Sequence, residues 1–144
     1  MKALILIGII AIMLGACETV TRPLPNTREM HDYFATHQTS FEHVTQDIIT
    51  ALDKHGEIGD ELKTGAHYKI LTIISREPKI IRYHTHTKGF AMGMYGTGIV
   101  FFEVPPEKAY ANIEDMYDDA RAVEGFEGYS LIKGNWYTFL WEVD

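Results

Sequence analysis

The C-terminal segment of residues 126–143, FEGYSLIKGNWYTFLWEV, carries the clearest strand pattern of the chain. Two runs rich in aromatic and branched residues flank Gly134-Asn135, and this pattern predicts a hairpin with a two-residue type II′ loop. Alternation then assigns the side chains to two faces. The face expected to meet the core consists of Phe126, Ile132, Tyr137, Phe139, Trp141 and Val143. The opposite face carries Tyr129, Leu131, Trp136 and Leu140 among polar residues.

Further strand-like runs precede this hairpin. Residues 67–75 (HYKILTIIS) and 80–87 (IIRYHTHT) are rich in β-branched residues and are joined by a turn at residues 76–79. Residues 90–95 and 98–104 are two more candidates, separated by glycines. Together these segments predict a largely antiparallel sheet of about five strands.

Residues 27–54 have the three- and four-residue apolar spacing of an amphipathic helix. The apolar positions are Met30, Tyr33, Phe34, Phe41, Val44, Ile48 and Leu52, with His37 filling a gap. Asn26 with Glu29 predicts a capping pair, and Gly56 predicts the C-terminal stop. Because Thr39 and Glu42 repeat the capping pattern, two shorter helices are the alternative. A second helix is expected to open at Pro105-Pro106 and to end at Gly125.

These elements give the order α-β-β-(β)-β-α-β-β, which is an α+β domain over residues 27–144. The chain has 144 residues, of which 46% are hydrophobic, enough to bury a core without disulfides. Its formal net charge of −7 argues against a nucleic-acid partner, since binding phosphates requires a basic face. Its single cysteine excludes a disulfide framework and a multi-cysteine metal site.

The N-terminus has the features of a secretory signal peptide. Lys2 is followed by the apolar run ALILIGIIAIML at residues 3–14. Twelve helical residues span roughly 18 Å, short of the ~30 Å of a bilayer core. A short apolar run with a basic start is typical of secretion signals. An uncleaved N-terminal anchor is the alternative.

The tetrad Leu14-Gly15-Ala16-Cys17 resembles the lipobox of bacterial lipoproteins. The resemblance implies cleavage before Cys17, a diacylglyceryl group on its sulfur and an acyl chain on its new amino terminus. Residues 1–16 are then the signal peptide, and residues 17–26 are the lipidated cysteine and its tether. Two or three acyl chains anchor a protein stably in a bilayer. Glu18, rather than Asp, favours the outer membrane over the inner membrane, on the periplasmic side.

The predicted function is binding of an envelope protein partner near the membrane. Tyr129, Leu131, Trp136 and Leu140 would form an apolar patch with a polar rim, which is typical of protein-binding surfaces. The alternative is that a helix of the same domain covers them. No nucleophile–base pair or catalytic motif can be named, so we expect no enzyme activity, no catalytic residue and no cofactor beyond the acyl chains.

A second hypothesis is a periplasmic zinc or copper protein. His84 and His86 lie two apart in a predicted strand and should therefore point the same way. With a three-residue loop before the next strand, Met92 would lie beside His84 as a thioether ligand. The plainer interpretation is a solvated histidine and arginine face with methionines in the core. The acidic residues Glu114, Asp115, Asp118 and Asp119 are likewise expected to form a solvated helix face.

Overall fold

The computed structural model describes residues 24–90 and 93–143. In chain order the elements are α2 (Thr27–His55), the short 3₁₀ helix η1 (Asp60–Leu62), β1 (Ile70–Arg76), β2 (Lys79–Phe90), β3 (Gly93–Phe102), α3 (Ile113–Ala120), β4 (Glu127–Lys133) and β5 (Trp136–Val143). The lipobox and signal peptide lie outside the described residues, as does Met92. Among residues 24–90 and 93–143, no helix has the length and hydropathy of a membrane span.

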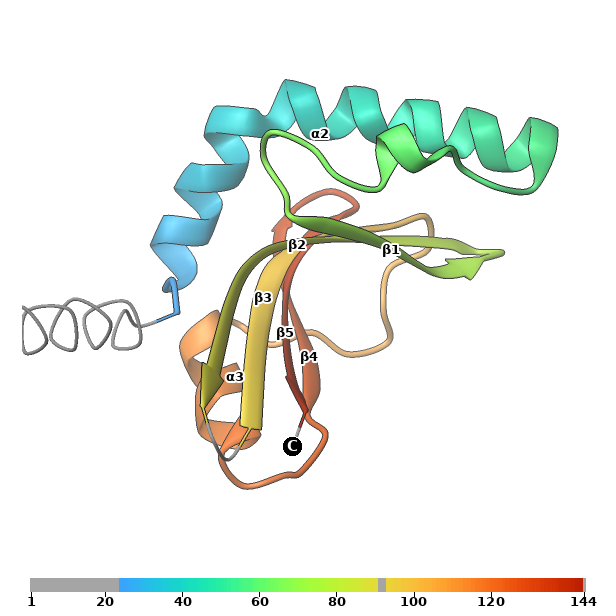
Figure 1. The fold of residues 1–144 in the computed structure, drawn as a ribbon. Coiled ribbons are helices and arrows are strands. Elements are labelled where there is room, and N and C mark those ends of the chain that lie inside the picture. The colour runs from blue at the N-terminus through green and yellow to red at the C-terminus, as the bar shows by residue number, and fades with distance from the viewer. Residues whose placement is uncertain (1–23, 91–92, 144) are drawn as a thin grey trace, which may run out of the picture.

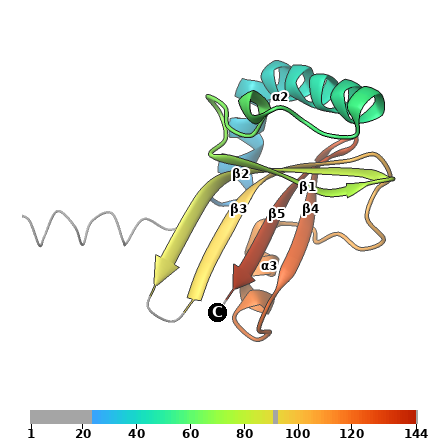
Figure 2. The ribbon, with the colours of Figure 1, turned by 45° about the vertical axis from the view of Figure 1, so that its right-hand side comes forward.

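The five strands form one antiparallel sheet in the order β1-β2-β3-β5-β4 (Figure 1). This is the α+β class predicted from the sequence. The two short strands expected at residues 90–95 and 98–104 are a single strand, β3. It pairs with β2 along almost its whole length, so the intervening glycines do not interrupt the ladder. Figure 2 shows β2 and β3 bending along their length.

Helix α2 has the predicted ends. The Asn26 side chain accepts from the Glu29 amide and the Glu29 carboxylate accepts from the Asn26 amide, which is a capping box. Gly56 ends the helix with a left-handed φ of 72°. The helix is one continuous element that bends in Figure 1. Within it, the Thr36 hydroxyl donates to the Asp32 carbonyl. Such i−4 back-bonding often bends helices.

Helix α3 is shorter than predicted, because it begins at Ile113 and not at Pro105-Pro106. The Asn112 side chain caps it by accepting from the Asp115 amide. Before that cap, the Tyr110 amide donates to the Tyr129 carbonyl, and this bond holds the segment at the edge of β4. A sheet-edge contact therefore outweighs the helical spacing of the residues that follow the prolines.

The core has two parts, one on each face of the sheet. The larger part lies beneath α2 and α3 and includes Phe34, Phe41, Tyr83, Met116 and Trp136. The smaller part has four buried members, Val100, Phe102, Tyr137 and Phe139, with Ile80, Tyr129 and Trp141 packed against them. All seven of these residues belong to strands, so no helix of the described part of the chain packs on this second face. We call it the helix-free face.

Candidate functional site on the helix-free face

The predicted four-residue hairpin patch does not exist as one surface. The turn is as expected, since Lys133 pairs with Trp136 across Gly134-Asn135. However, a register shift between Leu131 and Lys133 leaves Ile132 without a partner in the ladder. A bulge of this kind moves every residue on its far side to the other face.

The bulge splits the patch into two pairs. Trp136 and Leu140 are 7% and 0% exposed and belong to the core beneath α2. Tyr129 and Leu131 lie opposite Phe139 and Tyr137, on the helix-free face. The prediction that Tyr137, Phe139 and Trp141 share a face with Phe126 and Ile132 is therefore wrong as well.

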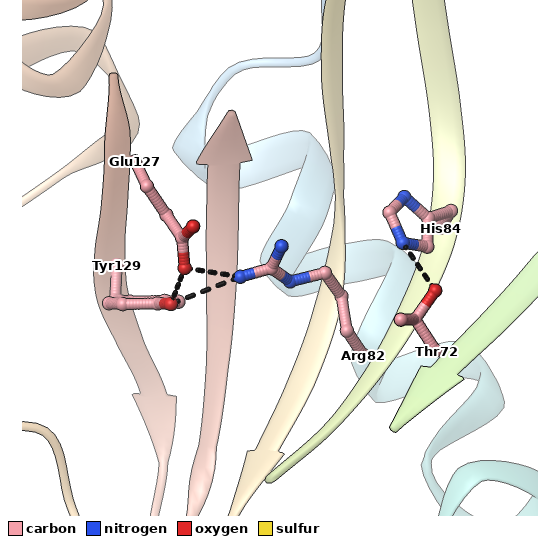
Figure 3. Close-up of polar contacts among 5 residues, drawn as sticks. All are labelled: Thr72, Arg82, His84, Glu127 and Tyr129. Carbon is pink, nitrogen blue, oxygen red and sulfur yellow. Dashed lines mark hydrogen bonds and ion pairs between the residues drawn. The ribbon is translucent and has the colours of Figure 1, made fainter. Parts of the chain in front are cut away.

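A polar cluster occupies the centre of the helix-free face. Arg82 of β2 forms an ion pair with Glu127 of β4 and donates to the Tyr129 hydroxyl at 3.0 Å (Figure 3). The Tyr129 hydroxyl also donates to the Glu127 carboxylate. The Arg82 side chain is only 8% exposed, whereas that of Glu127 is 45% exposed. The cluster is thus buried at its cationic end and open to solvent at its anionic end.

This ion pair spans four strands and reports the curvature of the sheet. Strands β3 and β5 lie between β2 and β4, so a flat sheet would separate the two backbones by roughly 14 Å. Two extended side chains bridge that distance only where the sheet curls toward the helix-free face. The Arg82 guanidinium lies 4.6 Å from the centre of the Phe139 ring, which adds a cation–π contact.

His84 lies beside this cluster and is uncharged at neutral pH. Its ring packs edge-on against Phe139 and Trp141, and its Nε2 lies 3.2 Å from the Thr72 hydroxyl. Burial, together with the charge of Arg82, lowers the pKa of His84 to about 4. Near pH 7 the ring therefore acts as a neutral, aromatic member of the face.

The prediction that His84 and His86 point the same way, on which the two-histidine metal site depends, is wrong. The pairing of β2 with β3 shifts between His84 and His86, which leaves Thr85 as an extra residue. His84 consequently faces Phe139, whereas His86 packs against Tyr33 of α2 on the other face. Within residues 24–90 and 93–143, no three His, Cys, Asp or Glu side chains are placed to hold a metal ion.

The fold brings together two pairs of residues that the sequence does not connect, Arg82 with Glu127 and His37 with His67. Arg82 could have been noticed as a charge inside the apolar run 80–83, but nothing in the sequence pairs it with Glu127, 45 residues later. His37 and His67 stack with ring centres 4.0 Å apart. His37, which fills the gap in the apolar spacing of α2, is half-buried.

The predicted acidic face of α3 is partly engaged. Glu114 accepts from both the amide and the hydroxyl of Thr27, at the start of α2, and these bonds lower the pKa of its carboxyl. Asp119 accepts from the Tyr110 hydroxyl at 2.8 Å. These carboxylates tie α3 to its neighbours.

No family model, no curated protein and no solved structure matches this chain.

Proposed function

We propose that this protein is a lipid-anchored envelope lipoprotein whose folded domain binds a protein partner close to the membrane, through the helix-free face. The anchor follows from the lipobox resemblance at Leu14-Gly15-Ala16-Cys17. About nine residues separate Cys17 from the first residue of α2, so the domain stays near the bilayer. Glu18 after the cysteine favours the periplasmic side of the outer membrane. The role is one of binding and not of catalysis.

The observation that carries the proposal is that, among residues 24–90 and 93–143, only strand side chains pack on this face. Leu131 is 49% exposed, and Ile70, which pairs with His84, is 58% exposed. Arg82, Tyr129 and Trp141 belong to the same face. Tyr, Trp and Arg are the residues most enriched at the energetic centres of protein interfaces.

Site-specific crosslinking in the cell tests the partner surface. A photoreactive amino acid at Leu131 should give a covalent protein adduct that mass spectrometry identifies. The matched control is Val123, which is 55% exposed and follows α3, a helix that packs on the opposite face of the sheet. Adducts of equal yield at the two positions, or none at Leu131, would count against the proposed surface.

Intact mass spectrometry of protein recovered from the envelope tests the anchor separately. We expect a chain that begins at Cys17 and carries added acyl mass, and a Cys17→Ser variant without that mass. An unprocessed chain would remove the anchor from the proposal and leave the crosslinking result to stand alone.

A further inference from the structure

A cleft of about 460 Å³ lies on the opposite side of the sheet from Arg82. Tyr33 of α2 forms one wall, the loop that leads into β1 forms the other, and Thr85 at the bulge of β2 contributes the floor. In Figure 1 this loop runs beside α2 before it enters β1. The volume is within the range of about 300–1,000 Å³ that small-molecule sites occupy.

The charge of the cleft is opposite to that of the chain. The protein has 20 acidic and 13 basic residues, yet none of the eight residues that line the cleft is Asp or Glu. Lys69 and His67 do line it. No ion pair among the described residues involves Lys69, so its ammonium group is available to a ligand.

The aromatic walls are fixed in place and electrically neutral. The Tyr33 hydroxyl donates to the His67 carbonyl at 2.5 Å, and the Tyr68 hydroxyl donates to the Leu62 carbonyl at 2.9 Å. Burial raises the pKa of both phenols, so neither adds negative charge near pH 7. The stacking of His67 on His37 orients the imidazole at the rim.

The polar floor is built by the same bulge that separates His84 from His86. Thr85 is 8% exposed, and its hydroxyl donates to the Thr97 carbonyl and lies 2.8 Å from His86 Nδ1. Bulges frequently re-aim side chains beside functional sites. The cleft therefore has a hydrogen-bonded threonine at its floor, tyrosine side chains in its walls, and Lys69 and His67 at its rim.

We propose that this cleft binds a small phosphate ester, with the phosphate against Lys69 and His67 and the organic part against Tyr33 and Tyr68. Lysine is a common point-charge partner of phosphate, and tyrosine rings provide apolar area beside polar tips. The site is separate from the helix-free face and does not rest on the proposed function.

Amide chemical-shift titration of the full-length chain in neutral detergent tests this inference. The probes are inorganic phosphate and glycerol 3-phosphate, each compared with sodium chloride at matched ionic strength. We expect saturable shifts at Tyr33, His67, Lys69 and Thr85, with glycerol 3-phosphate binding more tightly than phosphate. Lys69→Gln should weaken binding by about fivefold or more, in line with loss of a charge-assisted contact.

Lys133→Gln is the matched control, because Lys133 is an exposed lysine at the far end of β4. Equal weakening by both lysine variants, or no shift beyond that of sodium chloride in any arm, would overturn the proposal.

Doping the micelles with phosphatidylglycerol identifies the source of the phosphate. Saturation by glycerol 3-phosphate indicates a soluble ester, whereas cleft shifts that require the doped micelles indicate a lipid headgroup.

Discussion

Gly98 lies in β3 between His84 of β2 and Phe139 of β5, where a side chain has no room. A Cβ atom there would lie 2.0 Å from the Tyr83 carbonyl oxygen and 2.9 Å from the Phe139 ring. The first of these neighbours is backbone and cannot rotate away. This glycine is what allows His84 and Phe139 to meet across the central strand.

Gly98→Ala should therefore lower the free energy of unfolding by at least about 2 kcal/mol, within the usual cost of overpacking. Urea unfolding followed by circular dichroism measures the change. Gly59→Ala is the control, because Gly59 has a φ of −68° and its new Cβ would meet only the flexible carboxylate of Glu61. If both variants are as stable as the parent, the result would contradict the close packing described around Gly98.

His84 gives the fold a sensitivity to acid. Its pKa falls from 6.5 to about 4 on folding, because of burial and the charge of Arg82. Between these values the unfolded chain binds a proton that the folded chain does not, so stability falls as the pH falls from about 6.5 to about 4. Above that window the contribution of this group to the pH dependence is zero.

A His84→Gln variant should accordingly lose less stability than the parent between pH 7 and pH 4, whatever its stability at pH 7. Urea midpoints at several pH values give the two slopes. Gln46→Ala, at an exposed position of α2 that carries no titratable group, should keep the slope of the parent. An unchanged slope in His84→Gln would contradict the buried, neutral state of the ring. The pKa of His86 is lowered too, and that contribution remains in both variants.

Helix α2 offers a direct comparison of two similar capping patterns. Asn26 with Glu29 and Thr39 with Glu42 look alike in the sequence, but only the first forms a capping box, since Thr39 lies inside the continuous helix. Asn26→Ala should cost about 0.5–2 kcal/mol, as loss of an N-cap side chain does. Thr39→Ala should be neutral or slightly stabilising, because alanine has the higher helix propensity. A larger loss from Thr39→Ala would indicate two helices in place of one.

At the scale of elements, the sequence is informative wherever a side chain acts on its own backbone. Caps, turns and spacing located α2, the β1–β2 turn and the Gly134-Asn135 hairpin, because each depends on residues within about four positions. The sequence does not reveal the start of α3, because that start depends on the pairing of Tyr110 with the edge of β4, a contact between distant segments.

The two bulges account for the errors at the candidate sites. Strict alternation predicts that His84 and His86 share a face and that Tyr129 shares one with Leu140. One extra residue, Thr85 or Ile132, reverses each conclusion. Neither residue has an unusual conformational preference, so nothing local in the sequence marks a bulge. Arg82, Glu127 and Tyr129 converge only because the sheet curls.

At the scale of the whole molecule, one sheet supports two cores. Strands β3 and β5 supply Ile99 and Trp136 to the core beneath the helices, and Val100 and Phe139 to the core of the helix-free face. Because consecutive residues of the same strand point into different cores, neither core can lose its packing while the other keeps its backbone in place. This arrangement predicts a single cooperative unfolding transition.

The two tryptophans report on the two cores separately. Trp136 packs against Phe34 and Phe101 beneath α2, whereas Trp141 packs on the helix-free face beside His84. Trp136→Phe retains only Trp141, so its fluorescence in urea should report the unfolding of the helix-free face. Trp141→Phe retains only Trp136, so its fluorescence should report the unfolding of the core beneath the helices. We expect each fluorescence transition to coincide with the loss of ellipticity of the same variant. If fluorescence in Trp136→Phe changed at a lower urea concentration than ellipticity, the helix-free face would be an independently opening layer. Its contacts, from Arg82 to Glu127, would then be too weakly held to present a fixed surface to a partner.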